Sequence, residues 1–170
     1  MKKINALANL LSNALFYVAL AAGALMMLHV TVDVASRTFL NYPLPGTGEI
    51  TATYYMIALA FLPLAWVTLR DEHVTADIFI GSLPGPLRHV IAVLVDVLVI
   101  IYVSAFVWQS TLSALARTRR GEVWEIIGGY LPVWPTRWFL PVAGGAMALV
   151  MIFRLLARLT GHKIETGEAK

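Results

Sequence analysis

Few residues in this sequence combine the types and the spacing that chemistry requires. Asp96 stands inside a long apolar stretch, where an acidic side chain is by default a candidate for proton or ion coupling. His73 and Asp77 are four residues apart, a spacing that would suit metal binding or a proton relay on one helix face. Because no third ligand accompanies them, we favour a hydrogen-bonded helix start over a metal site.

Most enzyme classes are disfavoured by what the sequence lacks. It contains no cysteine, which excludes thiolate nucleophiles, disulfides, iron–sulfur clusters and cysteine-ligated zinc. It also contains no His-x-x-x-His or His-Glu-x-x-His pattern and no phosphate-binding loop. A haem-binding subunit would need paired axial histidines on membrane helices, and only His29 falls within a long apolar stretch. We therefore expect a protein that is not an enzyme and that holds no cofactor or catalytic residue.

The composition is that of a membrane protein. Hydrophobic residues make up 59% and charged residues 14% of the 170 positions, and the mean hydropathy is +0.74, which is too apolar for an ordinary soluble domain. Several apolar stretches supply the about 20 residues that a helix needs to cross a bilayer. We predict an all-α membrane protein with one domain over 1–170 and a flexible polar tail over 160–170. The four predicted transmembrane helices are about 7–36, 49–69, 86–116 and 136–159.

Basic residues predict the orientation of these helices. With four spans both termini share one side, which holds eight Lys and Arg residues against five on the other side. The tendency of basic residues to stay inside then makes both termini cytoplasmic. Val74, Ile78 and Phe79 would share one helical face, which predicts a short amphipathic segment at the membrane surface between the second and third spans. On the opposite side we expect an aromatic belt of Trp108, Trp124, Trp134 and Trp138.

A compact turn over 41–49 separates the first two spans. Pro45 fixes the backbone angle φ there, and Gly46 permits a tight turn. Thr47 and Glu49 then place a capping hydroxyl and an anion at the start of the next helix. Close helix packing is also expected, at Ala19, Gly23, Gly144, Gly145 and Ala148. Pro63 predicts a kink in the second span.

The acidic residues of the spans have structural interpretations. Asp33 precedes Arg37 by four residues, the favourable order for a helical ion pair, and we prefer such a pair to a transport role. Asp96 is expected to hydrogen-bond across helices. Its candidate partners are Ser12, Asn13 and Arg70. The alternative is that Asp96 drives proton exchange in a small homodimeric exporter.

The basic cluster after the third span has two interpretations. Arg119 and Arg120 would either pair with lipid phosphate or dock an acidic partner protein. Overall, the small-residue faces and the kinked helices indicate a membrane subunit that packs against a larger partner.

Three parts of the sequence carry recognisable motifs. The first is Arg37 to Glu49, with its Pro-Leu-Pro-Gly-Thr-Gly-Glu turn, and the second is Arg70 to Asp77, with Arg-x-x-His-Val-x-x-Asp. The third, weaker part comprises Leu-Pro-Val-Trp at 131–134 and Phe-Leu-Pro-Val at 139–142. Together they resemble the small membrane subunit (DctQ-type) of tripartite ATP-independent periplasmic (TRAP) transporters, and length, spans and order agree over nearly the whole chain.

This resemblance implies a sodium-coupled secondary transporter in the bacterial inner membrane. A periplasmic binding protein would deliver organic anions, such as carboxylates or sugar acids, to a large elevator-type membrane subunit that binds substrate and sodium. Because the sequence ends at Lys170 without further spans, we expect that large subunit to be a separate chain. The present chain would be its scaffold and would itself bind no metal.

The scaffold interpretation assigns structural roles to the polar residues at both ends of the second span. Asp33, Arg37 and Glu49 would hold the outer corner, between the first and second spans. The inner corner would be fixed by Arg70, His73 and Asp77.

Overall fold

Four apolar helical spans build the structure, a computed structural model that describes residues 2–70, 84–126 and 128–160. Each is long and apolar enough to cross a membrane. They run over Ala8–Leu40, Thr47–Leu69, His89–Arg120 and Trp134–Leu159. The predicted class, an all-α membrane protein with four spans, is confirmed, and the chain is a multi-pass membrane protein.

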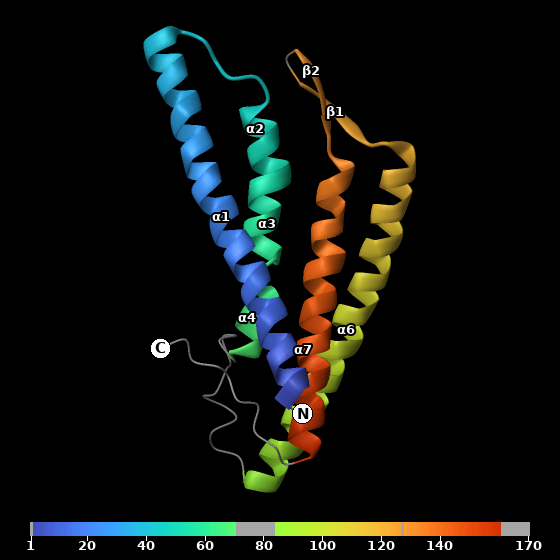
Figure 1. Ribbon diagram of the computed structural model, residues 1–170. Coiled ribbons are helices and arrows are strands. Elements are labelled where there is room, and N and C mark those ends of the chain that lie inside the picture. Colours follow the sequence, from blue (N-terminus) through green and yellow to red (C-terminus); the bar gives the residue numbers. More distant parts are fainter. Residues whose placement is uncertain (1, 71–83, 127, 161–170) are drawn as a thin grey trace.

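The spans are arranged as two pairs (Figure 1). The long helix α1 (Lys2–Leu40) lies beside the second span, which consists of α2 (Thr47–Ile50), the π-helical turn η1 (Thr51–Tyr55), α3 (Met56–Phe61) and α4 (Leu64–Leu69). The long helix α6 (Gly85–Arg120) lies beside α7 (Phe139–Leu159), which follows the 3-10 turn η2 (Trp134–Trp138). The two pairs approach most closely where α7 packs against α1, α3 and α4.

A short antiparallel hairpin, which was not predicted from the sequence, precedes η2. Strand β1 (Val123–Ile126) pairs with β2 (Gly129–Pro132), and Val123 lies opposite Pro132. The hairpin and the turn between α1 and α2 lie at one end of the bundle, which we call the hairpin end (Figure 1). The start of α1 and the end of α7 lie toward the opposite end, which we call the terminal end (Figure 1).

The second span is interrupted twice. Pro63 separates α3 from α4, because its ring removes one backbone donor and clashes with the preceding turn, and this break was predicted. The π-helical turn η1 was not predicted, and it accommodates one residue more than an α-helical turn would. Thr53 donates its hydroxyl to the carbonyl oxygen of Glu49 at 2.6 Å within this stretch.

Small side chains form close contacts both between the two pairs of helices, at Ala146, and within the first pair, at Ala19 and Ala58. One buried cluster joins Ala8, Ala65, Ala146 and Val150, and a second joins Ala19, Ala58 and Leu62. Small residues let helix backbones approach closely in a membrane, where the hydrophobic effect does not drive helices together. The predicted contact at Ala19 is therefore confirmed.

The third and fourth spans are also in close contact, at Val107 and Gly144. A Cβ atom added at Gly144 would lie 2.8 Å from Cγ2 of Val107, whereas one added at Gly145 would meet nothing within 4 Å. Of these two glycines, only Gly144 is required by the contact between α6 and α7.

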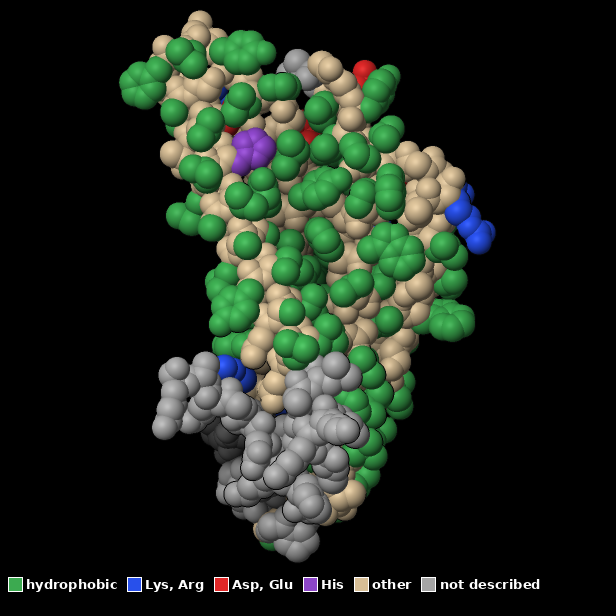
Figure 2. Space-filling model, in the orientation of Figure 1, with side chains coloured by type: hydrophobic (Ala, Val, Ile, Leu, Met, Phe, Trp, Pro, Cys, Tyr) green, Lys and Arg blue, Asp and Glu red, His purple; other side chains and the backbone are tan. Residues whose placement is uncertain are grey.

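The outer surface of the helices is apolar. Figure 2 shows hydrophobic side chains over most of the visible face, and exposed examples include Leu28 of α1 and Leu98 of α6. With 39 and 36 residues, α1 and α6 are about 58 and 54 Å long, well beyond the about 30 Å of a hydrocarbon core. Both helices are longer than their predicted ranges, and they extend outside a bilayer of ordinary thickness.

Candidate functional site

A buried carboxylate organises the corner between α1 and α2. Asp33 is 4% exposed, its Oδ1 accepts a hydrogen bond from the backbone N–H of Leu44 at 2.8 Å, and its Oδ2 lies 2.9 Å from Nη2 of Arg37. The ion pair between Asp33 and Arg37 is thus confirmed. The hydrogen bond to Leu44 adds a function that spacing did not reveal, because it ties the turn back onto α1.

The start of α2 differs from the prediction in one respect. Thr47 does not cap the helix: the preceding residue, Gly46, occupies the N-cap position, and the Thr47 hydroxyl lies 3.3 Å from the Leu44 carbonyl oxygen. A tight turn leads into α2, so the hydroxyl faces back toward the turn and α1 and not toward the free amides. Glu49 lies in the first turn of α2, where its charge complements the helix dipole as predicted.

Gly46 is needed at this corner for two reasons. Its φ of 78° lies in the left-handed region, which disfavours a side chain. A Cβ atom there would also lie 3.0 Å from Cδ1 of Ile126 in β1. The corner and the hairpin are therefore in close contact, although more than seventy residues separate them in the sequence.

An open hollow of about 810 Å³ lies between the corner and the hairpin. Its walls carry Arg37, Pro45 and Glu49 on one side and Ile126 and Gly128 on the other. Within the described part of the chain, the Glu49 carboxylate has no ion pair or hydrogen bond. The hollow therefore presents an uncompensated acidic group beside the paired Arg37.

Glu122 holds the base of the hairpin. Its two carboxylate oxygens accept hydrogen bonds from Nε and Nη2 of Arg137 at 3.1 and 3.0 Å, and Nη1 of Arg117 lies 3.5 Å away. The Arg137 hydrogen bonds, helped by the positive charges of both arginines, hold the pKa of Glu122 below its ordinary value although burial opposes them. Its backbone carbonyl also accepts the N–H of Val133 at 2.9 Å. One residue thus joins α6, the hairpin and η2.

Two further contacts connect the hairpin end. The Tyr54 hydroxyl donates to the carbonyl oxygen of Pro132, which links η1 to β2. Trp138 donates its indole N–H to the Thr118 hydroxyl at 3.0 Å, which links η2 to α6. Sequence analysis had not singled out Tyr54 or Glu122 for these roles. A signal for Glu122 was present, since an acid directly after a helix-ending glycine and an arginine cluster is placed to pair with that cluster.

Asp96 has a different partner from those predicted. It is 5% exposed, and its Oδ2 lies 2.8 Å from Nη1 of Arg158 near the end of α7. No hydrogen bond is aligned on that oxygen, so charge and not directional bonding holds the pair. The expected links to Ser12, Asn13 and Arg70 are wrong, because α7 and not α1 or α4 faces Asp96. The Ser12 hydroxyl, also buried, has no hydrogen-bond partner among the described residues.

The inner corner is described only in part. The Arg70 guanidinium lies 4.3 Å from the ring centre of Trp66, which in turn stacks on Phe16 of α1 at 4.3 Å, a cation–π contact that fixes the end of α4. His73 and Asp77 lie outside the described residues, as do the predicted amphipathic segment and the tail after Thr160. No three acidic or histidine side chains in the described ranges gather closely enough to hold a metal ion.

The tryptophans do not all lie at one level. Trp124, Trp134 and Trp138 belong to the hairpin and η2, but Trp108 lies twelve residues before the end of α6, about 18 Å along its axis.

Arg119 is exposed in the last turn of α6 and has no ion pair or hydrogen bond within the described chain. The same holds for Arg120.

Comparison with known proteins places these contacts in a family. Residues 26–161 match the family model of the DctQ component of tripartite ATP-independent periplasmic transporters. The chain belongs to the DctQ family. The matched range includes the Asp33 corner, the hairpin and the Asp96–Arg158 pair, so these contacts lie within the DctQ part of the chain. A search among curated proteins finds no match.

Membership in the DctQ family sets the class of function. DctQ is a component of a transporter and not an enzyme, and the chain is therefore a TRAP transporter small subunit. DctQ components act together with DctM and DctP components. The resemblance seen in the sequence is confirmed.

Proposed function

We propose that this DctQ chain is the scaffold subunit of a sodium-coupled TRAP transporter that imports organic anions, such as carboxylates or sugar acids. A periplasmic binding protein delivers the anion to a large elevator-type membrane subunit on a separate chain, and that subunit binds both substrate and sodium. The complex resides in the bacterial inner membrane with both termini of this chain in the cytoplasm.

One observation supports the scaffold role most directly. Two buried acidic side chains and one partly buried one hold helices and turns in place: Asp33 fixes the corner, Asp96 joins α6 to α7, and the partly buried Glu122 fixes the hairpin. An elevator needs a part that stays fixed while another part moves across the bilayer, and such internal links suit the fixed part. The close Arg158 contact also disfavours the alternative of a proton-coupled exporter that uses Asp96.

Reconstitution tests this proposal. The tagged chain is co-expressed with the large subunit and purified, and liposomes receive either the complex or this chain alone. With binding protein, a sodium gradient and radiolabelled carboxylates or sugar acids, we expect uptake only in liposomes that contain the complex. Accumulation of solute by liposomes that contain this chain alone would refute the scaffold role. Uptake by the complex without a sodium gradient would refute the coupling ion.

A further inference from the structure

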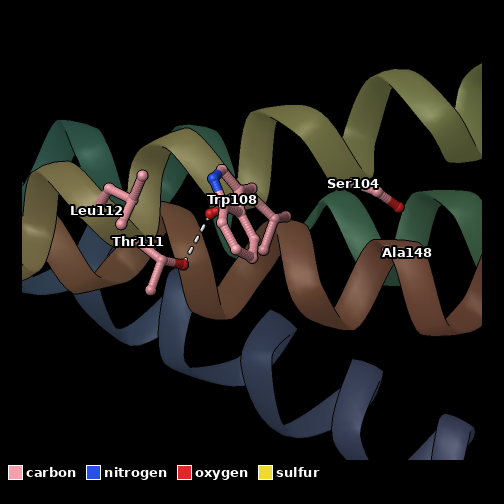
Figure 3. Close-up of a pocket in the computed structure, with 6 residues that line it drawn as sticks. Ser104, Trp108, Thr111, Leu112 and Ala148 are labelled. Carbon is pink, nitrogen blue, oxygen red and sulfur yellow. Dashed lines mark hydrogen bonds between the residues drawn. The ribbon is translucent and has the colours of Figure 1, made fainter.

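The surface between α6 and α7 carries a narrow apolar hollow. It encloses about 310 Å³, and its lining comprises Ser104, Val107, Trp108, Thr111 and Leu112 of α6 with Ala148 of α7. Figure 3 shows the Trp108 side chain extending from α6 across the hollow toward α7. The Thr111 hydroxyl donates to the carbonyl oxygen of Val107 at 2.7 Å, so this polar group is satisfied and the hollow is apolar in character.

An arginine side chain without a partner in the described chain lies on the same side of α6 as this hollow. At about 100° per residue, positions 108, 112, 115 and 119 fall on one side of α6, so Arg119 continues the row of Trp108 and Leu112. Arg120 lies about 100° further round the helix. Both arginines are exposed and have no ion pair or hydrogen bond within the described chain. The two arginines occupy different sides of α6, and only Arg119 lies on the side that carries the hollow.

The spacing between the cation and the hollow matches one leaflet of a bilayer. Trp108 precedes Arg119 by eleven residues, which corresponds to about 16 Å along the axis, and half of the hydrocarbon core is about 15 Å thick. We propose that this surface binds one anionic phospholipid, with its phosphate on Arg119 and one acyl chain in the hollow between α6 and α7.

A lipid fits this surface better than a helix of a partner protein does. A helix with its side chains is about 10 Å across, and α6 and α7 approach too closely at Val107 and Gly144 for one to enter between them. An acyl chain is flexible and only one methylene thick, so it fills a narrow hollow whose lining would otherwise lose van der Waals contacts. A guanidinium in the last helical turn is well placed for a phosphate group.

Native mass spectrometry of the full chain in mild detergent, titrated with palmitoyl-oleoyl phosphatidylglycerol, tests this inference. We expect one tightly bound lipid, and Arg119→Ala should weaken its binding about fivefold. The matched control is Arg120→Ala, with an expected change of less than about twofold. Palmitoyl-oleoylglycerol, which has the same chains but no phosphate, should bind the wild-type chain more weakly than phosphatidylglycerol does.

A second pair of variants tests the hollow itself. Ala148→Leu fills it and should lower lipid binding, whereas Ala105→Leu adds the same atoms at an exposed position of α6 outside the lining and should not. Arg119 is exposed, so its variant remains informative even where Ala148→Leu fails to fold.

Three results would overturn the inference. Equal losses for Arg119→Ala and Arg120→Ala would mean diffuse attraction to the membrane surface. An unchanged affinity in a folded Ala148→Leu variant would place the acyl chain elsewhere. If Arg119→Ala and Ala148→Leu bound lipid normally but recovered less of the large subunit, this surface would instead bind a helix of the partner protein. None of these results bears on the transporter role, which reconstitution tests separately.

Discussion

The carboxylate of Asp96 lies 2.8 Å from the guanidinium of Arg158, and this contact joins α6 to α7 toward the terminal end of the bundle. Arg137 and Glu122 make the equivalent link at the hairpin end, 3.0 Å apart. Arg137 precedes Arg158 by twenty-one residues, a rise of about 32 Å that matches the about 30 Å hydrocarbon core. The two ion pairs therefore lie about one hydrocarbon core apart along the bundle, one between α6 and α7 and the other between Glu122, just after α6, and Arg137 of η2, just before α7.

Breaking the Asp96–Arg158 pair on one side should destabilise the chain. Asp96→Ala leaves the Arg158 guanidinium, which is 24% exposed, without its counter-ion, and we expect a loss of about 2 kcal/mol in the free energy of unfolding. The double variant Asp96→Leu with Arg158→Leu should lose less, because no unpaired charge remains. Tryptophan fluorescence during thermal unfolding measures both. A double variant less stable than Asp96→Ala would contradict this account.

The hairpin should detach in acid. The pKa of Glu122 is held below its ordinary value of 4.5, chiefly by hydrogen bonds from Arg137. A depressed carboxyl pKa contributes stability that is present above 4.5 and is lost as the pH falls through the lower folded value. We expect the Tm of the wild type to fall more steeply below pH 4.5 than that of Glu122→Gln. Parallel pH profiles of the two proteins would contradict the role of Glu122.

The two members of the Asp33–Arg37 pair should differ in importance. Asp33→Ala removes the acceptor of the Leu44 N–H and should cost about 1–3 kcal/mol. Arg37 is 58% exposed, so Arg37→Ala should cost less than about 1 kcal/mol. Thermal unfolding of both variants in detergent provides the comparison. If Arg37→Ala were the more damaging change, the corner would depend on the ion pair and not on the bond to the turn.

Neighbouring glycines offer a matched test of the α6–α7 contact. Gly144→Ala forces a Cβ atom to within 2.8 Å of Val107 and should lower stability by about 1–3 kcal/mol. Gly145→Ala meets nothing within 4 Å and should be neutral or slightly stabilising. Val107→Ala should partly rescue Gly144→Ala. Equal Tm values for the two glycine variants would mean that α6 and α7 are not in tight contact there.

The Glu49→Ala variant should affect assembly with the large subunit but not the folding of this chain. Because its carboxylate faces the hollow without an ion pair among the described residues, Glu49→Ala should change the unfolding free energy of the isolated chain by less than about 0.5 kcal/mol. We expect it instead to lower the recovery of the large subunit or the uptake by the complex, without changing substrate capture by the binding protein. Normal recovery and uptake would mean that Glu49 has no part in the contact with the large subunit.

Local patterns in the sequence predicted the features that depend on local physics. Hydropathy alone revealed the four spans, because any bilayer-crossing helix needs an apolar run of a set length. The four-residue spacing revealed the pair of Asp33 and Arg37, and Pro63 revealed the break in the second span. Each of these follows from residues within one continuous stretch of the sequence.

Features that depend on which helices are neighbours were predicted wrongly or not at all. Asp96 was assigned partners on α1 and α4, but α7 covers it, and Arg158 lies at the same depth on that helix. The hairpin was missed because its short strands show no alternating pattern, and its base is fixed by Glu122 through contacts with Arg117 and Arg137. Hydropathy carries no information about such pairings.

The π-helical turn η1 sets the rotational phase of the second span. One additional residue in a helix rotates everything beyond it by about 100° relative to what precedes it. The residues before η1 face the corner and the hollow, and those after it, such as Ala58, face α1 and α7. Without the inserted residue, one of these two sets would point away from its contacts. The turn therefore lets one span contact both the corner with its hollow and the faces of α1 and α7, which an uninterrupted α-helix could not contact together.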